Sequence, residues 1–224
     1  MRRKKTLAVG EVYHVFNKSI ADYKIFNSEI EYLRMRDMIR YYQIENMPLR
    51  FSWFSEQVKV KEDGFNKHFT SVSQGKEKLV QIIAYCLMPT HLHLILKQLQ
   101  EKGVSIFMGN TLNSYSRYFN TKHKRRGPLW EGRFKNVLIK TDEQLLHLTR
   151  YIHLNPVTAY LVDNPQEWVM SSYKEYLLNT NGHNKICKYN DILEIEPTSY
   201  RGFVEDRISY QRELAKIKEL LLEA

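Results

Sequence analysis

Two apolar runs joined by a short turn constrain the fold of this chain more than any other part of its sequence. Residues 79–88 read LVQIIAYCLM and residues 91–98 read HLHLILKQ, and both have the apolar character of short buried strands. Pro89 and Thr90 between them are typical of a turn. We therefore expect two strands joined by a turn and buried within the domain.

The segments around these strands complete a recognisable order. The expected elements are a strand over 11–18, a helix over 28–47, the two strands above, a helix over 105–120, a strand over 133–140 and a helix over 141–155. Thr141 and Gln144 fit a capping box at the start of the last helix. This order predicts an α+β fold, a ferredoxin-like split antiparallel sheet with helices packed on it.

The rest of the chain divides into an insertion and an appendage. Residues 1–178 form the predicted main domain, and within it the Lys- and Glu-rich residues 48–78 fit either a helical insertion or a mobile excursion. Residues 179–224 form a predicted C-terminal appendage, and an amphipathic helix over 206–223 ends it. We assign no function to the insertion or the appendage.

The composition indicates a partner and excludes several classes of protein. Lys and Arg exceed Asp and Glu by nine among 224 residues, so a polyanion is the first partner to consider. The two cysteines have no recognisable spacing, and no secretory signal is visible, which favours a cytoplasmic protein with reduced thiols. The sequence contains no run of eighteen apolar residues, which excludes a membrane span. It also contains no phosphate-binding glycine loop that would indicate a nucleotide cofactor.

His91 and His93 form the first candidate site. They alternate with Leu92 and Leu94, so on a strand the two imidazoles share one face and the leucines the other. Each ring nitrogen needs a partner, which makes two adjacent imidazoles a poor core filling and a natural pair of metal ligands. The alternative is two ordinary strand residues, and a third ligand is needed to decide between them.

Tyr151 and Asn155 form the second candidate site. With His147 they follow the spacing i, i+4, i+8 and therefore share one face of the predicted helix. The amide oxygen of Asn155 can complete a metal site that two histidines begin. Alternatively, Asn155 precedes Pro156 and caps a following helix, and Tyr151 is a tyrosine beside the core.

Five blocks of sequence carry a family resemblance. In chain order they are YHVFNK, AYCLMPTHLHLILK, GPLWEGRFK, LLHLTRYIHLNPVTAYLV and SSYKEY, within about residues 8–178. Together they resemble the HUH-type single-tyrosine transposases, and above all the REP-associated tyrosine transposases of bacteria. The pairing of the His-x-His block with the Tyr-x-x-x-Asn block is the specific part of this resemblance.

The resemblance implies a complete chemistry. Carried over by position, Tyr151 is the nucleophile, and His91, His93 and Asn155 hold a divalent metal, Mg²⁺ or Mn²⁺. The implied reaction cleaves and rejoins single-stranded DNA through a 5′-phosphotyrosine, which keeps the bond energy and needs no ATP. The implied substrate is a hairpin-forming single strand, and the protein acts as a monomer or a homodimer.

A basic segment supports a DNA partner independently of the resemblance. Residues 103–130 contain no acidic residue, and aromatic side chains lie between the cations. Phosphates bind such cations and unpaired bases stack on such rings, although the same pattern also occurs in a solvated loop. The candidate DNA-binding residues are Arg117, Lys122, Lys124, Arg125, Arg126, Arg133 and Lys135.

Two other functions remain open on the sequence alone. One is a DNA-binding regulator that keeps the fold and the charge but cleaves nothing. The other is a metal-dependent nuclease that activates water, in which Tyr151 only binds the substrate. Covalent attachment of the protein to DNA separates both from the transposase.

Overall fold

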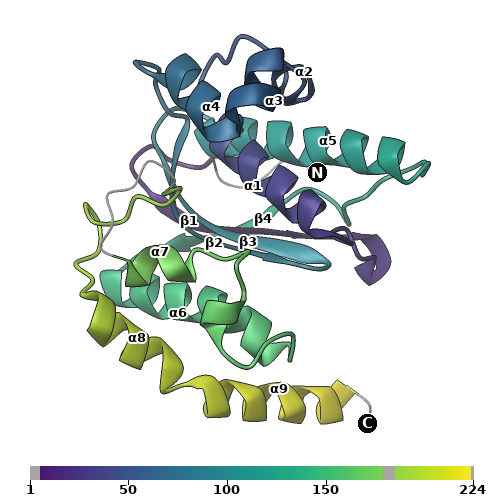
Figure 1. Cartoon of the computed structure of the whole chain (residues 1–224). Coiled ribbons are helices and arrows are strands. Elements are labelled where there is room, and N and C mark those ends of the chain that lie inside the picture. The colour runs from purple at the N-terminus through teal and green to yellow at the C-terminus, as the bar shows by residue number, and fades with distance from the viewer. Residues whose placement is uncertain (1–5, 179–184, 223–224) are drawn as a thin grey trace.

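The computed structural model describes residues 6–178 and 185–222, with side chains as far as residue 217. The start of the predicted appendage, residues 179–184, lies outside the described residues. Four strands form one antiparallel sheet in the order β2-β3-β1-β4 (Figure 1). Their bounds are β1 (Val12–Lys18), β2 (Val80–Met88), β3 (His91–Gln98) and β4 (Lys135–Ile139). This topology confirms the ferredoxin-like α+β prediction.

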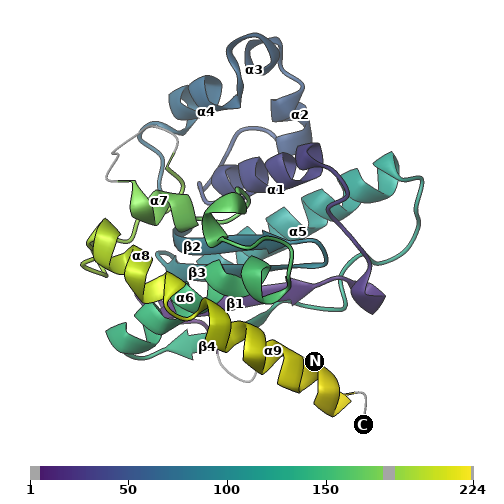
Figure 2. The same ribbon diagram turned by 60° about the horizontal axis from the view of Figure 1, so that its bottom comes forward.

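Helices cover both faces of the sheet. Helices α1 (Glu29–Tyr42) and α5 (Gly103–Lys122) lie on one face, and α6 (Asp142–Thr158) lies on the other (Figure 1). The turned view shows α6 between the sheet and the C-terminal helices (Figure 2). All nine residues of β2 are buried, which explains why its sequence is continuously apolar and does not alternate. None of the described helices combines the length and apolarity needed to cross a membrane.

The insertion between α1 and β2 is helical. It contains α2 (Phe51–Ser55), α3 (Val58–Asp63) and α4 (Phe65–Ser73), so the first of the two sequence interpretations is confirmed. Aromatic rings hold it on α1, with the ring of Phe54 centred 4.8 Å from that of Tyr41. Helix α1 ends at Tyr42 and does not reach residue 47, because the chain beyond it bonds to the approach to β2. The carbonyl of Gln43 accepts from the Leu79 amide at 2.8 Å.

The chain after α6 covers the outer edge of β2. The Leu87 amide donates to the Met170 carbonyl, and the Ile82 carbonyl accepts from the Lys188 amide, at 2.9 and 2.8 Å. These bonds leave less of the strand edge open to a foreign chain. Helices α7 (Tyr173–Leu177), α8 (Pro197–Glu205) and α9 (Ile208–Leu222) follow the same side of the molecule (Figure 2). The helix expected over 206–223 corresponds to α9.

Gly103 begins α5 where this helix meets the start of β2. A β-carbon at this position would overlap the backbone carbonyl of Leu79, which cannot turn aside as a side chain can. Gly103→Ala is expected to lower the free energy of unfolding by about 1–3 kcal/mol, as measured by urea denaturation. Gly109→Ala in the same helix meets open space and should be neutral or stabilising. Equal effects of the two changes would contradict the close contact.

Candidate active site

The register of the central strands places the two histidines on the face that α6 covers. His93 lies opposite Phe16 of β1, and His91 lies opposite Lys18. The imidazole centroids of His91 and His93 are 5.1 Å apart, with the rings nearly perpendicular. The histidines therefore lie on a central strand of the sheet, and they share one face of it, as the alternation of β3 predicts.

A third histidine, His14 of β1, joins the pair. Its Nε2 lies 2.9 Å from Nδ1 of His93, so one of the two nitrogens donates and the other accepts. Sequence reasoning missed this residue. His14 and Phe16 are two residues apart and therefore share one face of the first strand, but only the pairing of β1 with β3 brings His14 to His93. The bond orients the His93 ring, and when Nδ1 of His93 is the donor, the lone pair of its Nε2 remains for a metal ion.

Burial keeps the imidazoles neutral. It lowers the pKa of His93 to about 3, aided by the neighbouring His91 and His14, and lowers that of His14 to about 4. Burial also lowers the pKa of His91, and the charge of Lys18 adds to this effect. Nδ1 of His91 lies 3.0 Å from the Thr90 hydroxyl. Each member of the pair is thus a neutral ring, and the tautomer with its proton on Nδ1 presents the Nε2 lone pair that binds a metal.

Helix α6 brings Tyr151 to the histidines. The ring of Tyr151 meets that of His93 edge-on at a centroid distance of 6.0 Å. Its side chain remains 44% exposed, so a substrate can reach the hydroxyl. Burial of the inner part of the ring raises the pKa of the phenol, which stays protonated at neutral pH. The start of α6 is held by Thr141, whose hydroxyl accepts from the Gln144 amide at 3.1 Å.

Asn155 lies one turn beyond Tyr151 on the same face of α6. The helix continues through Pro156 to Thr158, so Asn155 does not cap a following helix and that alternative is wrong. Its side-chain Nδ2 is buried and has no hydrogen-bond partner within the described residues. The unpaired atom is a hydrogen-bond donor, so a metal ion would be bound by the other end of the carboxamide, its oxygen.

The donors available for a metal ion are two imidazoles and one amide. No group of three His, Cys, Asp or Glu side chains that could hold an ion occurs in the part of the chain that the structure describes. Within the described residues, the hydrogen bonds given above for His91 and His93 are made by Nδ1, which leaves their Nε2 atoms as candidate ligands. Asn155 brings a carboxamide oxygen. Neutral nitrogen and oxygen donors of this kind fit a divalent cation and leave room for substrate oxygens.

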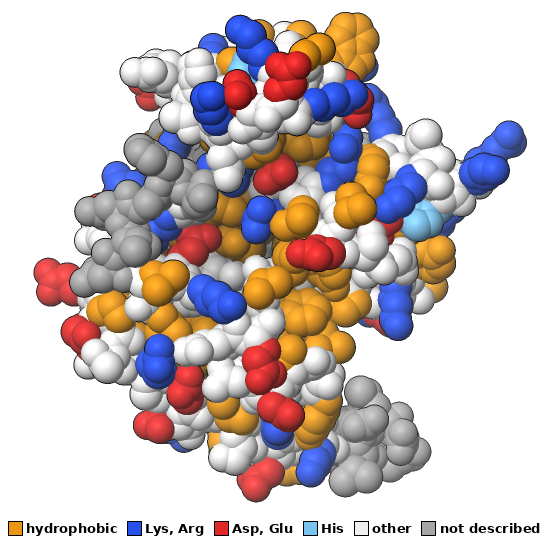
Figure 3. All heavy atoms as spheres, viewed as in Figure 1, with side chains coloured by type: hydrophobic (Ala, Val, Ile, Leu, Met, Phe, Trp, Pro, Cys, Tyr) orange, Lys and Arg blue, Asp and Glu red, His pale blue; other side chains and the backbone are white. Residues whose placement is uncertain are grey.

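The seven candidate DNA-binding residues fall into separate places. Lys124, Arg125 and Arg126 lie in the loop after α5, where Lys and Arg side chains gather at the right of the space-filling view (Figure 3). The Glu131 amide donates to the Lys18 carbonyl, so the chain after this loop passes the end of the sheet that holds His91. The basic loop therefore lies close to the end of the sheet at which His91 is located.

The remaining candidates lie on either side of the sheet. Arg133 precedes β4, and Lys135 on β4 pairs with Phe16, which places Lys135 on the histidine face. Arg117 and Lys122 belong to α5 on the other face. Lys122 forms an ion pair with the fully buried Glu31 at 2.8 Å, and this bond raises the pKa of Lys122. Its charge is therefore already partnered within the fold.

His153 anchors α6 from its buried side. Nδ1 of its ring lies 2.8 Å from the Tyr200 hydroxyl of α8, and Nε2 lies 2.8 Å from the Ser172 hydroxyl. The ring has no exposed surface, and burial lowers its pKa to about 3. These bonds join α6 to α8 and to the segment beside β2. They hold the helix that carries Tyr151 and Asn155.

The buried His153 makes stability depend on pH. Its pKa is depressed on folding, so between about pH 6.5 and 3 the unfolded chain binds more protons, and stability falls as the pH falls. The contribution lost at pH 5 is about 2 kcal/mol. His14 and His93 also lower the stability as the pH falls, so the contribution of His153 is obtained from the difference between wild type and a variant that lacks this ring.

Urea denaturation at pH 7.5 and pH 5 tests this role. His153→Gln is expected to be less stable at pH 7.5 and to lose about 2 kcal/mol less than wild type on acidification. His147→Gln, at an exposed position of the same helix, should follow wild type. If acidification destabilises His153→Gln as much as wild type, the ring is not held neutral.

Comparisons with known proteins agree with this geometry. The model of the family described as "Transposase IS200 like" matches residues 38–155, a range that contains His91, His93, Tyr151 and Asn155. A Haemophilus influenzae protein with the provisional name REP-associated tyrosine transposase is 31% identical over 104 residues. The match spans 42% of this chain and 58% of that protein, less than two thirds of its length.

One solved structure shows the same fold. The structure of a REP-associated tyrosine transposase bound to a REP hairpin matches with a TM-score of 0.50 at 17% identity, over 88% of this chain and 95% of that chain. A transposase structure from Deinococcus radiodurans gives a TM-score of 0.36 at 13% identity, over 68% of this chain and 95% of that one.

Proposed function

The chain belongs to the IS200-like transposase family, and from that premise we propose that it cleaves and rejoins single-stranded DNA through Tyr151. The observation that supports this role is the contact between Tyr151 and His93 within one chain. Tyr151 is 44% exposed, and its ring lies against the candidate metal ligand His93. Nucleophile and ligands can thus assemble without a second copy of the protein.

The proposed reaction exchanges one phosphate ester for another. The phenol oxygen of Tyr151 attacks the scissile phosphorus and forms a bond to the 5′ phosphate. The bond from phosphorus to the 3′ oxygen breaks, the phenol loses its proton, and the departing 3′ oxygen gains one. A second 3′ hydroxyl reverses these changes and releases the tyrosine, so no external energy source is consumed.

A divalent ion, Mg²⁺ or Mn²⁺, would be held by His91, His93 and Asn155. When bound, it supplies positive charge beside an oxygen of the scissile phosphate. The chain adds charge of its own, because Lys135 lies on the same face of the sheet in register with Phe16. Lys18 is in register with His91, but its ammonium group is paired with Asp22 at 2.9 Å. These charges favour the phenolate and the phosphate together.

The proposed DNA track continues from Lys135 and Arg133 to the loop that holds Lys124, Arg125 and Arg126. A single strand on this track passes the end of the sheet and reaches the histidine face. The related protein solved with a REP hairpin suggests a strand that carries a hairpin as the substrate. Aromatic side chains such as Tyr23, under the guanidinium of Arg125 at 5.5 Å, can stack with unpaired bases.

Tyr151→Phe is expected to abolish covalent attachment to DNA and to retain DNA binding, because it removes one oxygen and little packing. Hairpin oligonucleotides with single-stranded flanks are incubated with the protein and Mn²⁺, and adducts are resolved on a denaturing gel. Peptide mapping should place the adduct on Tyr151. Tyr118→Phe is the matched control and should form the adduct normally. Cleavage by Tyr151→Phe, with water as nucleophile, would contradict the mechanism.

His14→Ala is expected to weaken Mn²⁺ binding by about 10–100-fold, since His14 orients a ligand and does not bind the ion itself. Titration calorimetry measures the affinity, and circular dichroism checks the fold. His93→Ala should remove binding altogether, and His147→Ala should leave it unchanged. An affinity of His14→Ala equal to wild type would show that the bond to His93 does not orient the ligand.

A further inference from the structure

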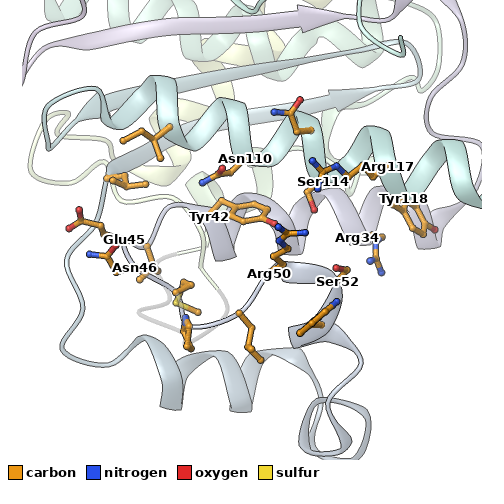
Figure 4. A pocket seen from close by; sticks show the side chains of 18 of the residues that line it. Arg34, Tyr42, Glu45, Asn46, Arg50, Ser52, Asn110, Ser114, Arg117 and Tyr118 are labelled. Atoms are coloured by element: carbon orange, nitrogen blue, oxygen red, sulfur yellow. The ribbon is translucent and has the colours of Figure 1, made fainter. Parts of the chain in front are cut away.

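A groove of about 1040 Å³ lies on the opposite side of the sheet from the histidines. Helices α1 and α5 and residues 44–53, which lead into α2, form its walls (Figure 4). The helical insertion thus closes one side of the groove. The proposed transposase chemistry does not use this surface.

The groove is positively charged on balance. Arg34, Arg50 and Arg117 line it, and none of them forms a salt bridge within the described residues. Figure 4 shows Arg34 and Arg117 toward one end, Arg50 near the middle and Glu45 toward the other end. Glu45 accepts a hydrogen bond from the Gln100 amide at 2.9 Å. Arg34 also interacts with the charge of Glu56, which is itself paired with Lys61. Three arginines without a salt bridge in the described residues favour an anionic ligand.

Arg34 is prepared for an acceptor that the chain does not supply. Its guanidinium lies 4.2 Å from the centre of the Tyr118 ring and 5.2 Å from that of Phe51. Its Nε is buried and has no hydrogen-bond partner in the described part of the chain. Burial also lowers the pKa of this guanidinium. A buried donor without an acceptor is costly, and a phosphate oxygen would satisfy it.

The rim of the groove offers an aromatic surface. Trp53 of α2 is 70% exposed, an uncommon position for the largest apolar side chain in a folded protein. Asn110, Asn113 and Ser114 of α5 add hydrogen-bonding groups along the wall. Cations for phosphates, an exposed ring for a base and amides for base edges are the components of a single-strand binding surface.

We propose that the groove between the insertion and α5 binds an unpaired segment of DNA, with phosphates on Arg34, Arg50 and Arg117 and a base stacked on Trp53. The inference rests on the proposed function for the choice of DNA as the polyanion. Helix α5 connects the groove to the basic loop at Lys124, so one strand can follow the protein from this face to the histidine face. The insertion thereby lengthens the DNA footprint.

The test measures binding of a fluorescein-labelled dT oligonucleotide to the full chain at several salt concentrations. Arg50→Gln combined with Arg117→Gln should weaken binding and reduce the log–log salt slope by about 1.4, since each lost phosphate contact with a single strand removes about 0.7. Lys174→Gln combined with Lys216→Gln removes two exposed charges from α7 and α9. This control should keep the wild-type slope, and an equal loss in both double variants would overturn the proposal.

Tryptophan fluorescence tests the stacked base. The oligonucleotide should quench wild-type fluorescence, and Trp53→Leu should lose that quenching and bind roughly tenfold more weakly. Trp130 follows the basic loop and can contribute quenching of its own, so the result that contradicts the stacking is a Trp53→Leu variant whose quenching equals that of wild type. A tetraglutamate peptide that quenches Trp53 as strongly as the oligonucleotide would overturn the assignment to nucleic acid.

The covalent-adduct assay separates this inference from the proposed function. If wild type forms the Tyr151 adduct but the Arg50/Arg117 double variant keeps the wild-type affinity and salt slope, the groove proposal alone is overturned. If wild type forms no adduct but the double variant binds the oligonucleotide more weakly, the groove remains a DNA-binding surface and the proposed cleavage by Tyr151 is overturned.

Discussion

The antiparallel pairing of β1 with β3 is the constraint on which the rest of the site depends. Because side chains alternate, the register that sets Phe16 against His93 also brings His14, His91 and Lys18 to one face. A slip of one residue would turn the His14 side of β1 toward α5 and remove buried residues such as Val15 from the positions into which they pack. Burial of both sheet faces makes that slip expensive, so the packing of the core fixes the positions of the histidines.

The second requirement is that α6 lies at the correct height over this face. The bonds of His153 to Tyr200 and Ser172 secure the back of the helix, while Tyr151 and Asn155 occupy its front. The C-terminal helix α8 therefore contributes to the site without touching it. A polar anchor of this kind fixes both the rotation and the position of α6, which apolar contacts alone leave less defined.

Basic residues follow a path around the domain. Lys122 forms an ion pair with Glu31 within the fold. The other basic residues lie on different sides of the sheet, namely Arg117, the loop after α5 and Lys135. A ligand that meets all of them must be long and flexible, which a single DNA strand is and a small molecule is not. The insertion adds a further wall to this path with Trp53 and Arg50.

The sequence by itself determined the order of elements and the shared face of His91 and His93, because these follow from local periodicity, and that order in turn predicted the class of sheet. Only the tertiary structure decided that His14 meets His93, that Asn155 lies inside α6 and that Lys122 is neutralised. These facts depend on contacts between residues far apart in the chain. No local pattern records which strands pair or which charges meet, because packing of the whole core selects them.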